Sequence, residues 1–269
     1  KEDFFMTKPS SERTSLNQQL RLALMQGWFE QIELLISRGA EITIPPQTNK
    51  IEGSHEGTPL HTIAYHTPAS DWAAERCIDA LLAAGANVNE TNHNGDTALH
   101  LASSRNHAVV VSKLLNAGAD INAKSSYRMC GTPLHVAASC FATEAVALLL
   151  SANADPNSHD IRETTPLAYL TQNIKGIFYP CRIHDDNIQK AADNILKMLL
   201  DAGADVTKKC GPDGSTALHY LVRYGDSSAL ESYLARNLLL EMRNTKQATP
   251  LQVATYEMIS YFGGARGVE

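Results

Sequence analysis

The sequence has no long hydrophobic run, no excess of positive charge and no recognisable catalytic motif. No apolar run approaches the roughly 20 residues that a membrane-spanning helix needs, so we expect no membrane insertion. The formal net charge of −6 gives no general attraction to nucleic acid, whose binding proteins carry a basic face. A phosphate-binding glycine loop, an H-E-x-x-H pair and a G-x-S-x-G turn are all missing. We therefore predict a non-enzymatic protein that uses no cofactor and no metal.

Cysteines are few and irregularly spaced. The five are Cys77, Cys130, Cys140, Cys181 and Cys210. An odd number without regular spacing favours free thiols in a reducing compartment over a disulfide framework, so we expect a cytoplasmic location. Because the chain begins with Lys1 and not with Met, we also expect it to be part of a longer protein.

One short pattern recurs along the chain, in which a threonine is followed two residues later by leucine. Its threonines are Thr58, Thr97, Thr132, Thr165, Thr216 and Thr249. A threonine hydroxyl can cap the start of a helix, and the proline that often follows suits the first helical position, where no hydrogen bond is lost. Two of the five intervals are 33 residues and the others are longer, which is typical of a 33-residue unit with loop insertions.

A second pattern keeps the same phase, in which a leucine-rich segment ends at Gly-Ala or a close variant. Its first residues are Gly39, Gly85, Gly118, Asn153, Gly203 and the degenerate Asn237. Glycine, and after it asparagine, suits the left-handed conformation that ends a helix. Two motifs in phase predict pairs of helices that repeat along the chain.

These motifs resemble the ankyrin repeat family, and the resemblance covers nearly the whole chain. It implies an all-α solenoid of helix-turn-helix units with protruding β-turn finger loops. We expect a flexible lead-in at 1–15 and an ankyrin repeat domain at 16–269. The repeat units are predicted at 16–48, 54–92, 93–127, 128–160, 161–211, 212–244 and 245–269, with an insertion at 171–190.

Histidines are the first candidates for chemistry. Four of them stand three residues after a capping threonine: His61, His100, His135 and His219. Because they occur one per repeat, they are too far apart for one catalytic or metal site, and the resemblance implies that they support the helix start and the turn. Cys181 and His184 form a second grouping inside the insertion, but a lone C-x-x-H lacks a second pair of metal ligands.

The resemblance implies that a partner docks on a concave face made by the finger tips and the inner helices, whose positions here include Tyr65 and His66. Tyrosine and arginine are enriched at binding hot spots. The candidate partner-binding residues are His93, Arg105, Tyr127, Arg128, Met129, Phe141, Arg162, Tyr169, Tyr220, Arg223 and Tyr224. An aromatic and basic strip on an acidic chain indicates an acidic or apolar peptide segment as the partner; for single residues, packing between repeats is the alternative.

Two further features bear on function. Loops often carry function, so the insertion supplies four candidate contacts, although a neutral surface insertion is the alternative. These contacts are Phe178, Tyr179, Arg182 and His184.

Asparagines at the end of the Gly-Ala motif are targets of an asparaginyl hydroxylase in ankyrin repeats of animal cells, which marks Asn89 and Asn122. The alternative is that these side chains stabilise the turn.

The sequence thus predicts a monomeric, non-enzymatic module that binds another protein. The alternative is the substrate- or host-target-recognition portion of a larger enzyme or of a secreted bacterial effector. In that case the catalytic domain lies outside this chain, and an effector would act in the host cytosol.

Overall fold

A computed structural model describes residues 10–43, 57–66, 71–126, 131–173, 186–210, 215–216, 219, 244, 246–249 and 252. The chain divides into two compact units. Unit 1 contains residues 1–120 and 125–127, and unit 2 contains residues 121–124 and 128–269. No helix among the described residues is both long and apolar enough to cross a membrane.

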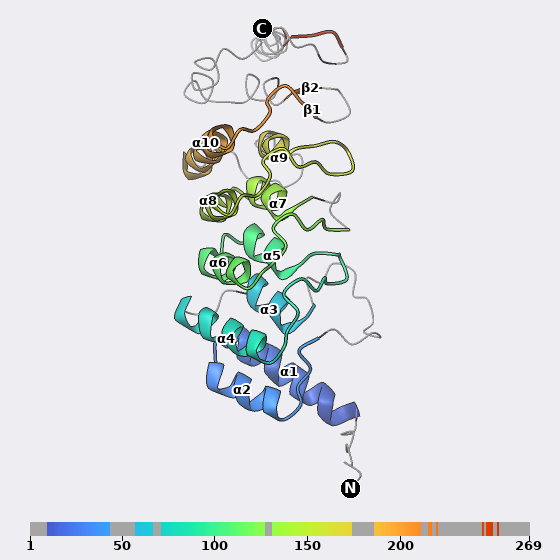
Figure 1. Ribbon diagram of the computed structural model, residues 1–269, viewed down its shortest axis with the longest axis vertical. Helices are drawn as coiled ribbons and strands as arrows, with labels where there is room; N and C mark the ends of the chain where they lie inside the picture. Colours follow the sequence, from blue (N-terminus) through green and yellow to red (C-terminus); the bar gives the residue numbers. More distant parts are fainter. Residues whose placement is uncertain are drawn as a thin grey trace, which may run out of the picture. The chain divides into compact units, whose positions relative to one another are not determined.

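Unit 1 consists of helix pairs in two layers (Figure 1). Its helices are α1 (Ser10–Gln26), α2 (Phe29–Ser37), α3 (Pro59–Tyr65), α4 (Asp71–Ala83), α5 (Ala98–Ser104) and α6 (Ala108–Asn116). The odd-numbered helices pack on one another in one layer and the even-numbered helices in the other, while each odd helix also packs on the even helix that follows. Leu24, Ile63 and Leu99 are fully buried between these elements, so each pair buries its apolar face against its neighbour.

Unit 2 repeats this arrangement. Its elements are α7 (Pro133–Ser139), α8 (Thr143–Ser151), α9 (Pro166–Asn173), α10 (Asp186–Asp201), β1 (Lys209–Cys210) and β2 (Ser215–Thr216). Helix α7 packs on α9 and α8 on α10, and the two short strands pair antiparallel with Lys209 opposite Thr216. The predicted all-α ankyrin-type architecture with β-turn fingers is confirmed.

The second helix of a repeat ends where the Gly-Ala motif predicts. Gly118 has φ +85°, and Asn153, its counterpart in the next repeat, has φ 65°. Both lie in the left-handed region, where glycine is unstrained and asparagine is the best-tolerated substitute. The asparagine therefore replaces glycine without changing the way the helix ends.

Two predicted boundaries differ from the structure. Helix α1 begins at Ser10, so residues 10–15, which were expected in a flexible lead-in, are helical. Their polar side chains carry no apolar period, yet they continue the helix that buries Leu16 and Leu20. Residues 171–173 end α9 and 186–190 begin α10, so both ends of the expected insertion are helical. Residues 1–9 and 174–185 lie outside the described part of the chain.

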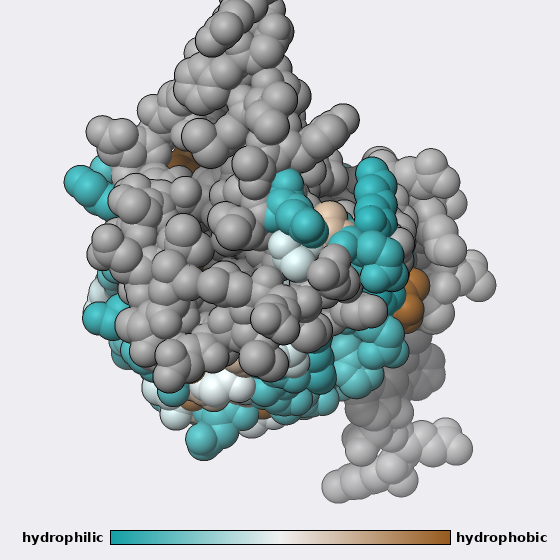
Figure 2. Space-filling model, turned by 90° about the horizontal axis from the view of Figure 1, so that it is seen from above, coloured by the Kyte–Doolittle hydropathy of each residue, from teal (hydrophilic) through white to brown (hydrophobic). Residues whose placement is uncertain are grey.

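The exposed surface is largely polar where it can be seen end-on. In that view the described residues are mostly hydrophilic, and apolar side chains appear as small separate spots (Figure 2). Exposed large apolar side chains do occur among the described residues, and Ile161 at 70% and Trp72 at 58% are the most exposed. Apolar side chains that are exposed singly are common on protein surfaces and do not by themselves mark a binding site.

Candidate functional site

Four repeats have a threonine and, three residues later, a histidine that bond to each other. At α3 the Thr58 N–H donates to His61 Nδ1 over 3.1 Å, and the Thr58 hydroxyl donates to the same nitrogen over 2.7 Å. The same pair of bonds joins Thr97 to His100, Thr132 to His135 and Thr216 to His219. The histidine takes the place of glutamate in a capping box, because its ring nitrogen accepts the free N–H of the capping residue.

The other ring nitrogen of the histidine reaches the next repeat. His61 Nε2 lies 2.9 Å from the Asp96 carbonyl, His135 Nε2 lies 2.9 Å from that of Thr164, and His219 Nε2 lies 3.0 Å from that of Ala248. A carbonyl can only accept, so Nε2 carries the proton and Nδ1 is the acceptor. The predicted structural role of these histidines is confirmed, and His61, His135 and His219 also join their repeats to the next.

Burial keeps His61 neutral. Desolvation is the largest cause that lowers its pKa, from 6.5 to about 4, and hydrogen bonding to the Asp96 carbonyl opposes this only in part. The neutral ring has the acceptor nitrogen that the helix start requires. A proton at Nδ1 would remove that acceptor and place a charge in the core.

A second set of contacts joins the turns of successive repeats. Asn89 Nδ2 donates to the Gly118 carbonyl over 3.3 Å, and its Oδ1 accepts the Asp120 N–H over 2.7 Å. Asn157 Nδ2 likewise donates to the Gly203 carbonyl over 2.9 Å, and its Oδ1 accepts the Asp205 N–H over 2.6 Å. Asn122 Oδ1 accepts the Asp155 N–H over 3.4 Å. These side chains stabilise turns, as the alternative interpretation of Asn89 and Asn122 held, and hydroxylation of the two stays a prediction.

A third set organises the finger loops and was missed by the sequence analysis. Asn92 Oδ1 accepts the N–H groups of Asn94 and Asp96, each over 2.9 Å. Asp160 Oδ1 accepts those of Arg162 and Thr164 over 2.8 Å, and Asn244 Oδ1 accepts those of Lys246 and Ala248 over 3.0 Å. The sequence signal is an Asn or Asp five residues before the capping threonine, which is turn chemistry typical of these side chains. We call residues 92–96 finger A and residues 160–164 finger B.

Finger B is also bonded to the helix that follows it. The Tyr169 hydroxyl on α9 donates to Asp160 Oδ2 over 2.9 Å, and the Tyr169 ring meets the His135 ring edge-on with centroids 5.0 Å apart. Asp160 is only 2% exposed, so a buried carboxylate accepts three hydrogen bonds at the base of the finger. Tyr169, a predicted partner-binding residue, is half-buried and contributes to the position of the finger.

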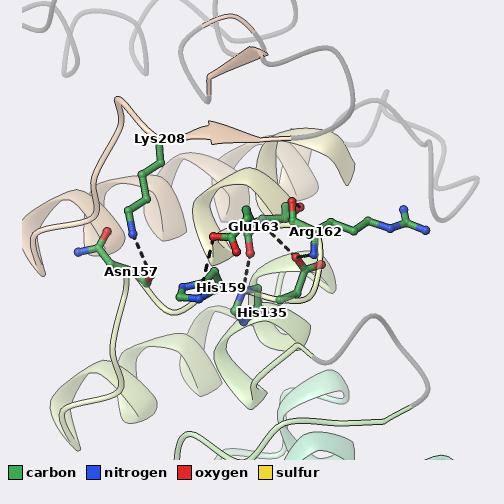
Figure 3. A network of polar contacts seen from close by, with 8 residues as sticks. His135, Asn157, His159, Arg162, Glu163 and Lys208 are labelled. Carbon is green, nitrogen blue, oxygen red and sulfur yellow. Dashed lines mark hydrogen bonds and ion pairs between the residues drawn. The ribbon is translucent and has the colours of Figure 1, made fainter.

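The tip of finger B carries exposed side chains of several kinds. Ile161 is 70% exposed, Arg162 is exposed, and His159 lies 4.0 Å from the Glu163 carboxylate. Figure 3 shows the Arg162 side chain extending away from His135, Asn157 and Lys208. Within the part of the chain that the structure describes, its guanidinium makes no hydrogen bond or ion pair. The predicted residue Arg162 therefore projects from the finger toward solvent.

Unit 1 places another predicted residue beside an aromatic ring. Arg105 is exposed at the end of α5, and its Cζ lies 4.1 Å from the centroid of the Tyr65 ring at the end of α3. His66 packs edge-on against the same ring with centroids 5.0 Å apart. His93, also predicted, is exposed on finger A. Arg105 is thus held against Tyr65 by a cation–π contact and remains exposed to solvent.

The remaining predicted residues differ in what the structure shows of them. Phe141 is half-buried between α7 and α8 with φ 56°, which is a strained conformation for a bulky side chain. Outside the described residues lie Tyr127, Arg128, Met129, Phe178, Tyr179, Arg182, His184, Tyr220, Arg223 and Tyr224. Among the described residues, no group of three His, Cys, Asp or Glu side chains is arranged to hold a metal ion.

Comparisons with known proteins agree with this architecture. Residues 69–160 match a family model described as ankyrin repeats in three copies. Ankyrin repeat and SOCS box protein 3 of Homo sapiens is 30% identical over 226 residues, which are 76% of this chain and 34% of that protein. E3 ubiquitin-protein ligase KEG of Arabidopsis thaliana is 26% identical over 236 residues, which are 87% of this chain and 13% of the ligase.

A shorter match is found in Rabankyrin-5 of Mus musculus, which is 36% identical over 88 residues, or 30% of this chain and 7% of that protein. The chain therefore spans about a third or less of the length of these three relatives. Ankyrin repeats are in general non-catalytic and bind other proteins. The family model, the relatives and the stacked helix pairs agree, and the chain belongs to the ankyrin repeat family.

Proposed function

We propose that the chain binds a partner protein through the finger and inner-helix surface of its repeats. The observation that carries this proposal is the tip of finger B, where Ile161 is 70% exposed beside the exposed Arg162. A partner would remove the Ile161 side chain from water, which favours association. Arginine is enriched at the energetic centres of interfaces. The pair offers an apolar and a charged contact at one position.

The base of finger B supports the same proposal. Asp160 accepts hydrogen bonds from two backbone N–H groups of the finger and from the Tyr169 hydroxyl. The loop is ordered by these bonds before any partner arrives. Binding then costs less conformational entropy than it would for a mobile loop.

The other candidate residues extend this proposal. His93 and Arg105 are exposed in unit 1, and Phe141 and Tyr169 are half-buried in unit 2. We propose that the partner contributes an acidic or apolar peptide segment. We further propose that the chain is monomeric and acts in the cytoplasm. The insertion contacts and the hydroxylation of Asn89 and Asn122 remain proposals on the same footing.

The test is a pull-down from cell lysate with mass spectrometry of the captured proteins. The wild type is compared with the double variant Ile161→Ser/Arg162→Ala. The matched control is Leu34→Ser, which removes an apolar side chain that is 49% exposed on α2, in the layer of even-numbered helices. We expect a partner to be lost with the finger variant and kept with the control. A set of captured proteins that is identical for all three would contradict the assignment of finger B.

A second candidate function rests on the lengths of the relatives. The matched region is 13% of a protein named as an E3 ubiquitin-protein ligase and 34% of a SOCS box protein. We propose as the alternative that these repeats are the substrate- or host-target-recognition portion of a larger enzyme or secreted effector. The full reading frame decides this, because a catalytic domain before or after this segment favours the alternative, and its absence favours a simple binding module.

A further inference from the structure

The ends of two inner helices in unit 1 bring one arginine onto one tyrosine. Tyr65 is the last residue of α3, and Arg105 directly follows α5. The Arg105 Cζ lies 4.1 Å from the Tyr65 ring centroid. A guanidinium stacked on an aromatic ring keeps its N–H donors in its own plane, where they match the two oxygens of a carboxylate. We call this pair the Tyr65–Arg105 platform.

No carboxylate among the described residues forms an ion pair with Arg105. Within the described ranges its guanidinium makes no ion pair and no hydrogen bond, and the residue is exposed. Lys113 on α6 is different, because its Nζ lies 3.1 Å from the Asp79 carboxylate. Arg105 is therefore a cation whose donors are unpaired within the described part of the chain, and the formal net charge of the whole chain is −6.

Two histidines lie beside the platform. His66 packs edge-on against Tyr65, and His107 Nδ1 donates to the Ala64 carbonyl over 3.1 Å. Desolvation, followed by the charge of Arg105 on His66, lowers the pKa of His66. Desolvation also lowers the pKa of His107, which Arg105 lowers further while the Ala64 carbonyl and Asp71 raise it. Two neutral rings therefore flank one positive charge.

We propose that the Tyr65–Arg105 platform binds the carboxylate of an aspartate or glutamate side chain in a partner protein. This inference rests on the proposed function and names the chemistry of one contact within it. The stacking fixes the guanidinium before the partner arrives, so little side-chain entropy is lost when the carboxylate docks. The carboxylate supplies the negative charge that Arg105 lacks within the described chain.

The experiment selects peptides from a random displayed library on the immobilised wild-type chain and then measures their affinities. Selected peptides are tested against Arg105→Leu, Arg105→Lys, Tyr65→Leu and Tyr65→Phe. The control Arg38→Leu removes one positive charge at the end of α2. We expect one peptide position to be enriched in Asp or Glu, and Arg105→Leu to weaken these peptides by about tenfold or more. Arg105→Lys weakens them too, because lysine lacks the planar fork.

The tyrosine variants test the platform itself. Tyr65→Phe keeps an aromatic face and should retain affinity, while Tyr65→Leu should weaken the acidic peptides, and Arg38→Leu should have little effect. Peptides that depend on finger B but show no acidic position, or bind Arg105→Leu as well as the wild type, would overturn the platform and leave the proposed function standing. A library that yields no peptide sensitive to finger B or to Arg105 would overturn both.

Discussion

Finger A and finger B are built on the same turn but are secured differently. In each, one side-chain oxygen accepts two backbone N–H groups, from Asn92 in finger A and from Asp160 in finger B. The two fingers differ in what the other polar atom of this side chain contacts. Asp160 Oδ2 accepts the Tyr169 hydroxyl, whereas the buried Asn92 Nδ2 has no hydrogen-bond partner among the residues that the structure describes. The other part of the difference is the helix residue, because the repeat of finger A has Leu101, which carries no hydroxyl, where that of finger B has Tyr169.

The largest expected effect tests this difference at its base. Asp160→Ala leaves three donors without an acceptor, and we expect it to destabilise the chain by about 4 kcal/mol. Asn92→Ala leaves two donors and also removes an unpartnered amide, so we expect a loss of about 2 kcal/mol. Urea denaturation followed by circular dichroism measures both. Equal losses would show that the Tyr169 contact adds nothing to finger B.

The second expected effect concerns the histidine that holds the end of finger A. The pKa of His61 is lowered from 6.5 to about 4, so the unfolded chain binds this proton more readily than the folded chain. The contribution of His61 to the free energy of unfolding is fully present above about pH 6.5 and is lost as the pH falls through 4. By linkage the wild type should lose about 3 kcal/mol more than His61→Gln between these limits.

Glutamine is a suitable replacement because the chain already uses it at this position. Gln252 Oε1 accepts the Thr249 N–H over 2.9 Å, as His61 Nδ1 accepts that of Thr58. Denaturation at several pH values compares His61→Gln with wild type, and His159→Gln, which changes an exposed histidine beside finger B, is the control. Parallel pH profiles for the wild type and His61→Gln would contradict the assignment.

The smallest expected effect compares the tips of the two fingers. Gly95 in finger A has φ +75°, and a Cβ there would lie 2.5 Å from the Ser126 nitrogen. Glu163 stands at the corresponding place in finger B with φ 58°. We expect Gly95→Ala to destabilise by about 2 kcal/mol, because strain and a backbone clash combine, and Glu163→Gly to stabilise by up to about 1 kcal/mol. Thermal melts measure both, and a destabilised Glu163→Gly would show that its side chain supports the finger.

Much of the framework could be predicted because it depends on short segments. The capping threonines and the helix ends at Gly118 and Asn153 follow from local turn chemistry, which the sequence displays in phase. The Asn92 and Asp160 turns are equally local, since each bonds within five residues, and their spacing before the threonine could have revealed them. The start of α1 at Ser10 was harder, because polar residues without an apolar period carry no signal.

The contacts between repeats could not be predicted from the sequence. His61 reaches the Asp96 carbonyl across 35 positions, and Arg105 stacks on Tyr65 across two helices. Both depend on how one helix pair packs on the next. A pattern of residue types within one repeat gives no orientation of a side chain in its neighbour.

By itself, the sequence determined that this chain is a series of helix pairs, where the pairs begin and end, and that it belongs to the ankyrin repeats. Those features follow from hydrogen bonds and backbone conformations within a few residues. Only the tertiary structure decided that Asp160 joins a finger to α9, that the histidines join successive repeats, and that Arg105 lies exposed on Tyr65. These depend on distances between residues far apart in the chain, which packing of the buried apolar faces sets.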